Sequence, residues 1–191
     1  MVYFSNVDAS AEETIRGQPT IGLRSSWLNA VKVAGGIGPY PATREEVTIA
    51  GEPYVAWQFT NVLALGVGAP MILNSIGPGS NGATIGVAPR VRLGYPKFES
   101  IYPYIVASVG PSWMRVPQQV WMSGFNLSAD AGVSFRIAKS FSLLAEFGYM
   151  YAAYSADMPL YETKVPPFAP IMHGTTRVSY LSVGGGVELQ F

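Results

Sequence analysis

Hydrophobic residues alternate with small or polar residues along most of this chain. The pattern is clearest near the C-terminal end, where alternate positions are apolar: Leu181, Val183, Val187 and Leu189. The positions between them are small or polar, among them Ser182, Gly184 and Glu188. A strict period of two is typical of a β-strand whose two sides face different environments. The pattern therefore predicts a strand over 179–191 with one apolar face.

Seven earlier segments show the same alternation, and each predicts a strand: 20–28, 54–59, 62–73, 84–95, 101–114, 126–138 and 141–154. Together with the closing strand they make a set of eight. One residue does not fit, because Pro89 lies well inside a predicted strand and has no N–H to donate to a neighbouring strand. We expect either a bulge at Pro89 or a strand boundary that differs from the predicted one.

The connections between the predicted strands alternate between short and long. Short connections lie at 60–61, 97–100 and 139–140, whereas longer ones follow Leu28, Leu73, Met114 and Tyr154. Antiparallel strands connected in this way place all short turns at one end and all long loops at the other, which is the layout of transmembrane β-barrels. The longest predicted loops are 29–51 and 155–176.

Composition supports a membrane location. Of the 191 residues, 49% are hydrophobic and only 13% are charged, whereas a soluble domain usually carries about 25% charged residues. The 12 basic and 12 acidic side chains cancel, so the charge does not favour nucleic acid as a partner. The sequence has no run of about 18 apolar residues that would form a transmembrane helix. A membrane-spanning form of this chain must therefore be a closed barrel.

The small and polar face of the predicted strands also carries charges of both signs. They are four arginines and three acids: Arg24, Arg90, Arg92, Arg136, Asp130, Glu146 and Glu188. The rest of this face is mostly Gly, Ala and Ser, which suits the narrow interior of an eight-stranded barrel. We therefore predict an ionic network in the lumen, in which Glu146 and Glu188 contact arginines of this set.

Three stretches of the predicted strands are distinctive: Tyr-Pro-Tyr-Ile-Val-Ala-Ser-Val-Gly at 102–110, Ser-Leu-Leu-Ala-Glu-Phe-Gly-Tyr at 142–149 and Val-Glu-Leu-Gln-Phe at 187–191. Together they resemble the eight-stranded outer-membrane β-barrels of the OmpA-like and OmpX-like superfamily. The resemblance implies an all-β fold, namely an eight-stranded antiparallel up-and-down transmembrane β-barrel over 20–191 that follows an N-terminal tail over 1–19.

The same resemblance implies a cellular location and partners. The location is the outer membrane of a Gram-negative bacterium. The implied partners are outer-membrane lipids, lipopolysaccharide and, during biogenesis, the barrel assembly machinery. Val187, Leu189 and the terminal Phe191 resemble the signal that this machinery reads. A protein partner that binds the long extracellular loops is a further expectation.

Aromatic residues near the strand ends predict two interfacial girdles, the rings that border the apolar belt of such barrels. One group lies near the short turns and comprises Phe59, Tyr95, Tyr102 and Phe141. The other lies near the long loops and comprises Trp27, Trp113 and Tyr151. Packing of the same rings inside a soluble barrel is the alternative interpretation.

Candidate catalytic and metal-binding residues are few. The only histidine, His173, falls in the predicted loop 155–176, and no serine stands at a spacing that would pair it with a nucleophile. With one histidine and no cysteine, the sequence shows no metal-ligand pattern. Gly184–Gly186 is not a phosphate-binding loop, because no helix follows it. We expect no enzymatic activity, no cofactor and no metal.

Three functions remain open at this stage. The first is a non-enzymatic barrel with a side-chain-filled lumen, which acts through its long extracellular loops or as a membrane-anchored structural or assembly component. The second is a narrow channel or carrier for small solutes, and the third is a soluble lipocalin-like barrel. The N-terminus lacks a basic segment followed by an apolar core, so we expect an exported protein to be a mature form with an added Met1.

Overall fold

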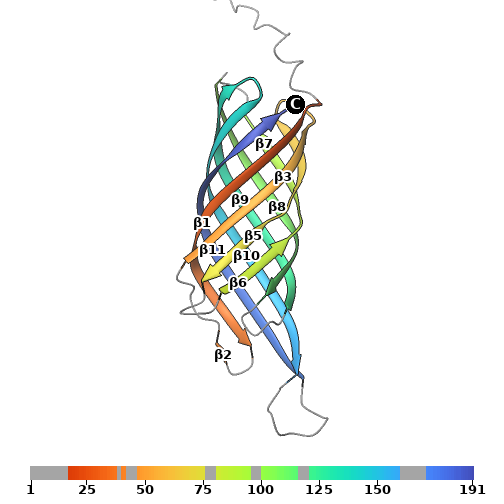
Figure 1. Cartoon of the computed structure of the whole chain (residues 1–191), viewed down its shortest axis with the longest axis vertical. Helices are drawn as coiled ribbons and strands as arrows, with labels where there is room; N and C mark the ends of the chain where they lie inside the picture. Colours follow the sequence, from red (N-terminus) through yellow and green to blue (C-terminus); the bar gives the residue numbers. More distant parts are fainter. Residues whose placement is uncertain are drawn as a thin grey trace, which may run out of the picture.

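The strands of this chain close into one barrel (Figure 1). The computed structural model describes residues 17–37, 40–41, 47–75, 81–95, 100–115, 121–159 and 171–191. Strand β1 pairs with β3 on one side and with β11 on the other, so the first and last strands of the barrel meet. All pairings between described strands are antiparallel.

The strands are β1 Pro19–Ile37, β2 Tyr40–Pro41, β3 Val47–Gln58, β4 Leu63–Gly68, β5 Met71–Ser75, β6 Asn81–Gly86, β7 Ala88–Gly94, β8 Ile101–Arg115, β9 Trp121–Ala138, β10 Phe141–Pro159 and β11 Ile171–Gln190. β4 and β5 lie end to end beside β3 and together form one strand of the barrel. β6 and β7 lie end to end beside β8 and form another. The short β2 only pairs with the end of β1. The result is an eight-stranded antiparallel barrel, and the predicted fold class is confirmed.

Residue parity decides which side of the wall a side chain faces. With few exceptions, even-numbered residues of the described strands are buried and odd-numbered residues are exposed. The exposed set contains large apolar side chains all around the barrel, such as Leu73 at 65%, Val183 at 60% and Phe147 at 57% exposure. An apolar surface of this extent is unfavourable in water but is the normal outer face of a transmembrane barrel. The lipocalin-like alternative, which needs the apolar face inside, is therefore wrong.

Two of the predicted strands are interrupted in the structure, and Pro89 lies close to one of the interruptions. The strand predicted over 84–95 is divided at Val87, and the strand predicted over 62–73 is divided at Ala69–Pro70. Pro89 itself is in register with Val67 and faces outward. Backbone hydrogen bonds continue across the breaks, since the Val87 N–H donates to the Pro111 carbonyl at 3.1 Å and the Ala69 N–H donates to the Pro53 carbonyl at 2.9 Å. The break thus lies two residues before Pro89, which is itself paired within β7, and the wall stays closed there.

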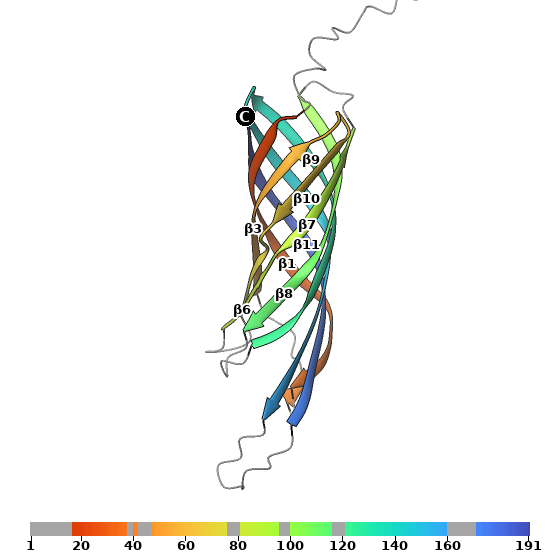
Figure 2. The same cartoon turned by 90° about the vertical axis from the view of Figure 1, so that its right-hand side faces the viewer.

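The strands at the loop end are longer than the alternation predicts. β1 continues to Ile37, β10 continues to Pro159 and β11 begins at Ile171, so most of the predicted loop 29–51 and half of the predicted loop 155–176 are strand. The hydrophobic pattern ends earlier because only membrane-spanning residues need one apolar face, whereas backbone pairing continues beyond it. Figure 2 shows β10 and β11 reaching past the other strands. The segments 42–46 and 160–170 lie outside the described residues.

The described part of the N-terminal segment begins at Gly17, and the barrel begins at Pro19. Most of the predicted tail over 1–19 is therefore outside the described residues. In the part of the chain that the structure describes, no helix is long and apolar enough to cross a membrane.

Because odd-numbered residues face lipid, a charge placed on the outer face should lower the free energy of unfolding more at the middle of the membrane than near its surface. Phe147 faces outward halfway along the membrane-spanning part of β10, where it pairs with Val183 and Ala131. We expect Phe147→Arg to lower the free energy of unfolding in lipid vesicles by about 2–4 kcal/mol. Ser155→Arg, at an exposed position nearer the loop end of the same strand, is the matched control and should cost at most about 1 kcal/mol. Urea titration measures both, and equal costs would contradict the assigned lipid face.

Candidate functional site in the barrel lumen

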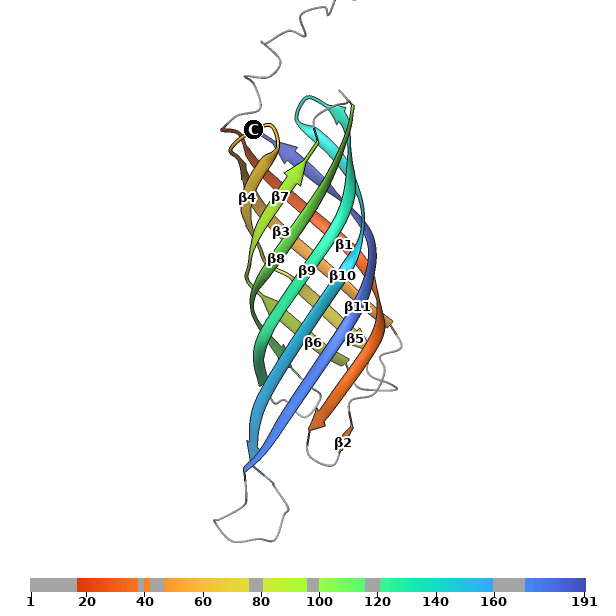
Figure 3. The same cartoon turned by 180° about the vertical axis from the view of Figure 1, so that it is seen from behind.

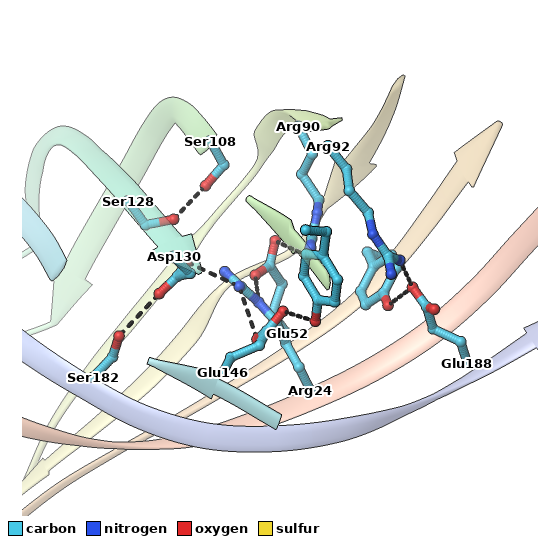
Figure 4. A network of polar contacts seen from close by, with 12 residues as sticks. Arg24, Glu52, Arg90, Arg92, Ser108, Ser128, Asp130, Glu146, Ser182 and Glu188 are labelled. Carbon is cyan, nitrogen blue, oxygen red and sulfur yellow. Dashed lines mark hydrogen bonds and ion pairs between the residues drawn. The ribbon is translucent and has the colours of Figure 1, made fainter. Parts of the chain in front are cut away.

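The lumen contains a network of ion pairs centred on Arg24 (Figure 4). Arg24 is an even-numbered residue of β1 and therefore points inward. Its Nε donates to Oε2 of Glu52, and its Nη1 lies 3.0 Å from Asp130 Oδ2 and 3.2 Å from Glu146 Oε2. These carboxylates come from β3, β9 and β10. One guanidinium thus connects four strands through the interior.

Glu52 extends this network to a second arginine. Arg90 Nη1 lies 3.1 Å from Glu52 Oε1, close enough for an ion pair, although the two atoms do not have hydrogen-bond alignment. The Arg90 guanidinium also lies over the ring of Tyr54, with its Cζ 4.0 Å from the ring centroid. The aromatic face therefore offsets part of the cost of burying this cation.

A second ion pair lies nearer the short turns. Arg92 donates to Glu188 Oε1, and the Tyr54 hydroxyl donates to the same oxygen at 2.5 Å. The Arg92 guanidinium packs on the ring of Tyr104 at 3.8 Å, and the Tyr104 hydroxyl donates to Glu146 at 2.7 Å. Tyrosines therefore connect the two groups of ion pairs. Glu188 is only 1% exposed, so it has no access to bulk water.

Toward the loop end the lumen changes from ionic to neutral polar and then to apolar. Ser182 donates to Asp130 at 2.9 Å, and the hydroxyls of Ser108 and Ser128 are 2.8 Å apart. Beyond them lie two clusters of buried apolar side chains: Leu28, Ala50, Ile72, Met150, Val178 and Tyr180 in one, and Met114, Met122, Ala152 and Tyr154 in the other. The loop-end half of the described interior thus holds two apolar clusters and no charged side chain, but it also buries the polar side chains of Thr48, Thr84, Ser112, Asn126 and Thr176. Sequence analysis did not anticipate this layer.

The structure brings together six of the seven charged residues predicted for the lumen. Arg24, Asp130 and Glu146 meet directly, Arg92 pairs with Glu188, and Arg90 joins through Glu52.

Arg136 is the exception and corrects the prediction. Its side chain is exposed, and it makes no ion pair with a described carboxylate. The reason is its position, because Arg136 lies close to the turn at 139–140, where β9 ends and β10 begins.

Glu52 and the lumen tyrosines were not predicted as members of the network. Glu52 stands between Gly51 and Pro53, which made the segment resemble a loop, yet all three residues belong to β3. Its even number was the available signal, since Glu52 has the same parity as Tyr54 and Gln58 on a predicted strand. Glu52 is 4% exposed and changes the balance of the network to three arginines and four carboxylates.

Most of the predicted interfacial aromatics face outward, although Trp27 and Tyr151 lie well inside β1 and β10 and not near their ends. Trp27 is 72% exposed, Tyr95 58%, Phe59 53% and Trp113 40%. Phe141 and Tyr151 are half-buried on the outer face, and Tyr151 lies against Phe125 with ring centroids 6.0 Å apart.

Tyr102 does not belong to a girdle, so this part of the prediction is wrong. Its even number turns it inward, where its ring lies 5.7 Å from Arg92 Cζ and its hydroxyl donates to the Asn61 carbonyl at 2.5 Å. Closeness to a strand end therefore does not suffice to place an aromatic residue at the interface, because parity decides the side.

Two further sequence expectations concern the C-terminal strand. Val187, Leu189 and Phe191 all face outward, and the Phe191 N–H donates to the Pro19 carbonyl at 3.1 Å. Their role as an assembly signal stays a prediction. His173 was expected in a loop but lies within β11, opposite Asp157. The side chains of this pair are outside the described part of the chain.

The network predicts that replacing a buried arginine lowers the free energy of unfolding far more than replacing an exposed one. Arg24→Met leaves Asp130 and Glu146 buried without their cation, so we expect a loss of about 3–5 kcal/mol in the free energy of unfolding. Arg136→Met is the matched control, and its cost should stay within about 0.5 kcal/mol. Urea unfolding in lipid vesicles, followed by tryptophan fluorescence, measures both values. Similar costs for the two variants would show that the ion pairs do not support the barrel.

Known structures share this fold at very low sequence identity. No protein-family model and no curated protein sequence matches the chain. Neisserial surface protein A is similar with a TM-score of 0.61 at 13% identity, and the match covers 91% of this chain and 97% of that one. Outer membrane protein W of E. coli has a TM-score of 0.55 at 11% identity, with coverage of 93% and 100%. OprG of Pseudomonas aeruginosa has a TM-score of 0.54 at 9% identity, with coverage of 92% and 96%.

Each of these three relatives in fold is an outer-membrane protein or a surface protein by its name, and each is matched over nearly its whole length. At such identities the similarity concerns the fold and not the activity. It agrees with the apolar exterior and the closed strand pairing of this chain. The chain therefore has the fold of the eight-stranded outer-membrane β-barrels, and it resembles that superfamily without matching one particular member.

Proposed function

We propose that this chain is a small, non-enzymatic barrel of the outer membrane of a Gram-negative bacterium, and that its lumen does not conduct. It acts at its loop end or as a membrane-anchored structural or assembly component. The observation that carries this proposal is the filled interior, because ion pairs occupy the turn-end half and buried uncharged side chains, among them two apolar clusters, occupy the described loop-end half.

The two halves of the lumen block different kinds of solute. Ions would have to pass the buried, uncharged side chains around Met122 and Tyr154, which are 0% and 5% exposed, without bulk water to solvate them. Apolar solutes would have to break the ion pairs of Arg24 and Arg92, which is costly once the charges are buried. A barrel of eight strands has room for little more than its own side chains. The interior therefore supports a sealed barrel rather than a channel or carrier.

A sealed barrel can act only through its ends or its outer surface. The loop end offers the extended sheet of β1, β10 and β11, in which β10 and β11 remain paired as far as Pro159 and Ile171. The pairing of β10 with β9 ends earlier, at Ser155 and Ser123. This projecting sheet supports the proposal of a protein partner at the loop end. Outer-membrane lipids, lipopolysaccharide and the barrel assembly machinery complete the proposed partners.

Conductance in planar lipid bilayers tests the proposal. The folded protein, checked by heat-modifiable migration on a denaturing gel, should insert without producing discrete current steps, because no aqueous path crosses the two layers. A heat-unfolded sample is the control for leakage caused by protein or detergent alone. Reproducible single-channel steps from the folded form, absent from the control, would favour the narrow-channel alternative and overturn the proposal.

A further inference from the structure

Acidic and basic side chains are sorted between the inside and the outside of this barrel. The acidic side chains that the structure describes all face the lumen: Glu52, Asp130, Glu146 and Glu188. The charged side chains described as exposed are all basic: Arg115, Arg136, Lys139 and Arg177. The described exterior therefore carries only positively charged side chains. Such an exterior attracts anions at the membrane surface.

Two of the exposed cations lie toward the loop end of β8 and β11, two strands that are separated by β9 and β10. Arg115 is the last residue of β8 and pairs with Trp121 of β9. Arg177 of β11 pairs with Ala153 of β10, which pairs in turn with Phe125 of β9. Figure 3 shows β8, β9, β10 and β11 side by side on one face of the barrel.

Aromatic side chains occupy the surface between these two arginines. Trp121 and Phe125 are four residues apart on the outer face of β9, with exposures of 52% and 46%, and Phe125 contacts Tyr151 of β10. We call Arg115, Trp121, Phe125, Tyr151 and Arg177 the loop-side rim patch. In this patch two outward-facing arginines flank three aromatic rings at the border of the apolar belt.

The chemistry of the patch fits one kind of partner. Aromatic rings with a polar edge prefer the level of the lipid headgroups, and guanidinium groups bind phosphate through two parallel N–H···O bonds. Neither Arg115 nor Arg177 makes an ion pair with a described carboxylate. Their charge is therefore available to a ligand that presents phosphate at the same depth as the rings. A lipid headgroup satisfies both conditions at once.

We propose that the loop-side rim patch is a binding site for a phosphate-bearing lipid of the leaflet on that side, with Arg115 and Arg177 holding the phosphate groups and the aromatic rings covering the sugar or glycerol and the first part of the acyl chains. This inference rests on the proposed membrane location and names the residues that recognise the lipid. It does not depend on whether the lumen is sealed.

Quenching of a single tryptophan measures the site locally. Trp121 lies in the patch, and the other three tryptophans, Trp27, Trp57 and Trp113, can be replaced by phenylalanine. In phosphatidylcholine vesicles, brominated phosphatidic acid should quench Trp121 at lower mole fraction than brominated phosphatidylcholine. An arginine near a charged membrane surface contributes about a fivefold gain in affinity, so the double variant R115Q/R177Q should lose a preference of roughly that size or more.

The opposite rim supplies the matched control. R136Q/K139Q removes the same amount of charge at the turn end, and it should leave the quenching of Trp121 unchanged. Equal losses in the two double variants would show a general effect of surface charge and overturn the site, as would the lack of any preference in the parent protein. Displacement of the lipid by inorganic phosphate would indicate a site for the free anion and would also overturn it.

Heat-modifiable migration shows whether each variant is folded. If both double variants are folded and show the same quenching of Trp121, the lipid site is refuted, whereas the conductance result is unaffected. A conducting barrel that still prefers phosphatidic acid would refute the sealed lumen and leave the site intact.

Discussion

The interior of this barrel depends on the burial of Arg24 among carboxylates from three other strands. A guanidinium in a narrow lumen loses its hydration, which costs several kcal/mol, and only close counterions offset that loss. Glu52, Asp130 and Glu146 supply them from β3, β9 and β10. A shift of any of these strands by one residue would turn its carboxylate to the lipid. The ion pairs therefore stabilise the register of the strands as well as the charges themselves.

The two sides of the wall follow from the same alternation. Outward residues such as Leu73 and Phe147 are exposed because lipid replaces water around them. Inward residues form an ionic half and an uncharged half that contains two apolar clusters, and both fill the space that eight strands leave. All described carboxylates are inside, whereas cations remain at both rims. The exterior of the described part of the barrel is therefore basic.

Much of this arrangement could be predicted from the sequence, because alternation is a direct consequence of strand geometry. The eight strands, their faces and the inward position of Arg24 and Glu188 follow from parity alone. The sequence did not reveal the strand character of Glu52, because neighbouring Gly51 and Pro53 are typical of loops. It also did not reveal the full lengths of β10 and β11, because paired strands outside the lipid need no apolar face. Tyr102 was misplaced because closeness to a turn does not decide which side of the wall a residue faces, and Arg136 was misplaced because parity does not give depth in the barrel.

The parity of β8 offers the most direct test of the central claim that odd residues face lipid and even residues face a sealed lumen. The chain has no cysteine, so single cysteines can be placed at Ile105, Ala107 and Val109 on the outer face and at Val106 and Ser108 on the inner face. The measurement is the rate of reaction with a lipid-soluble maleimide in proteoliposomes, compared with the rate after unfolding. The structure predicts rapid reaction at the three odd positions and protection at the two even ones until the barrel unfolds. Equal reactivity at all five positions, or protection of the odd set, would contradict it.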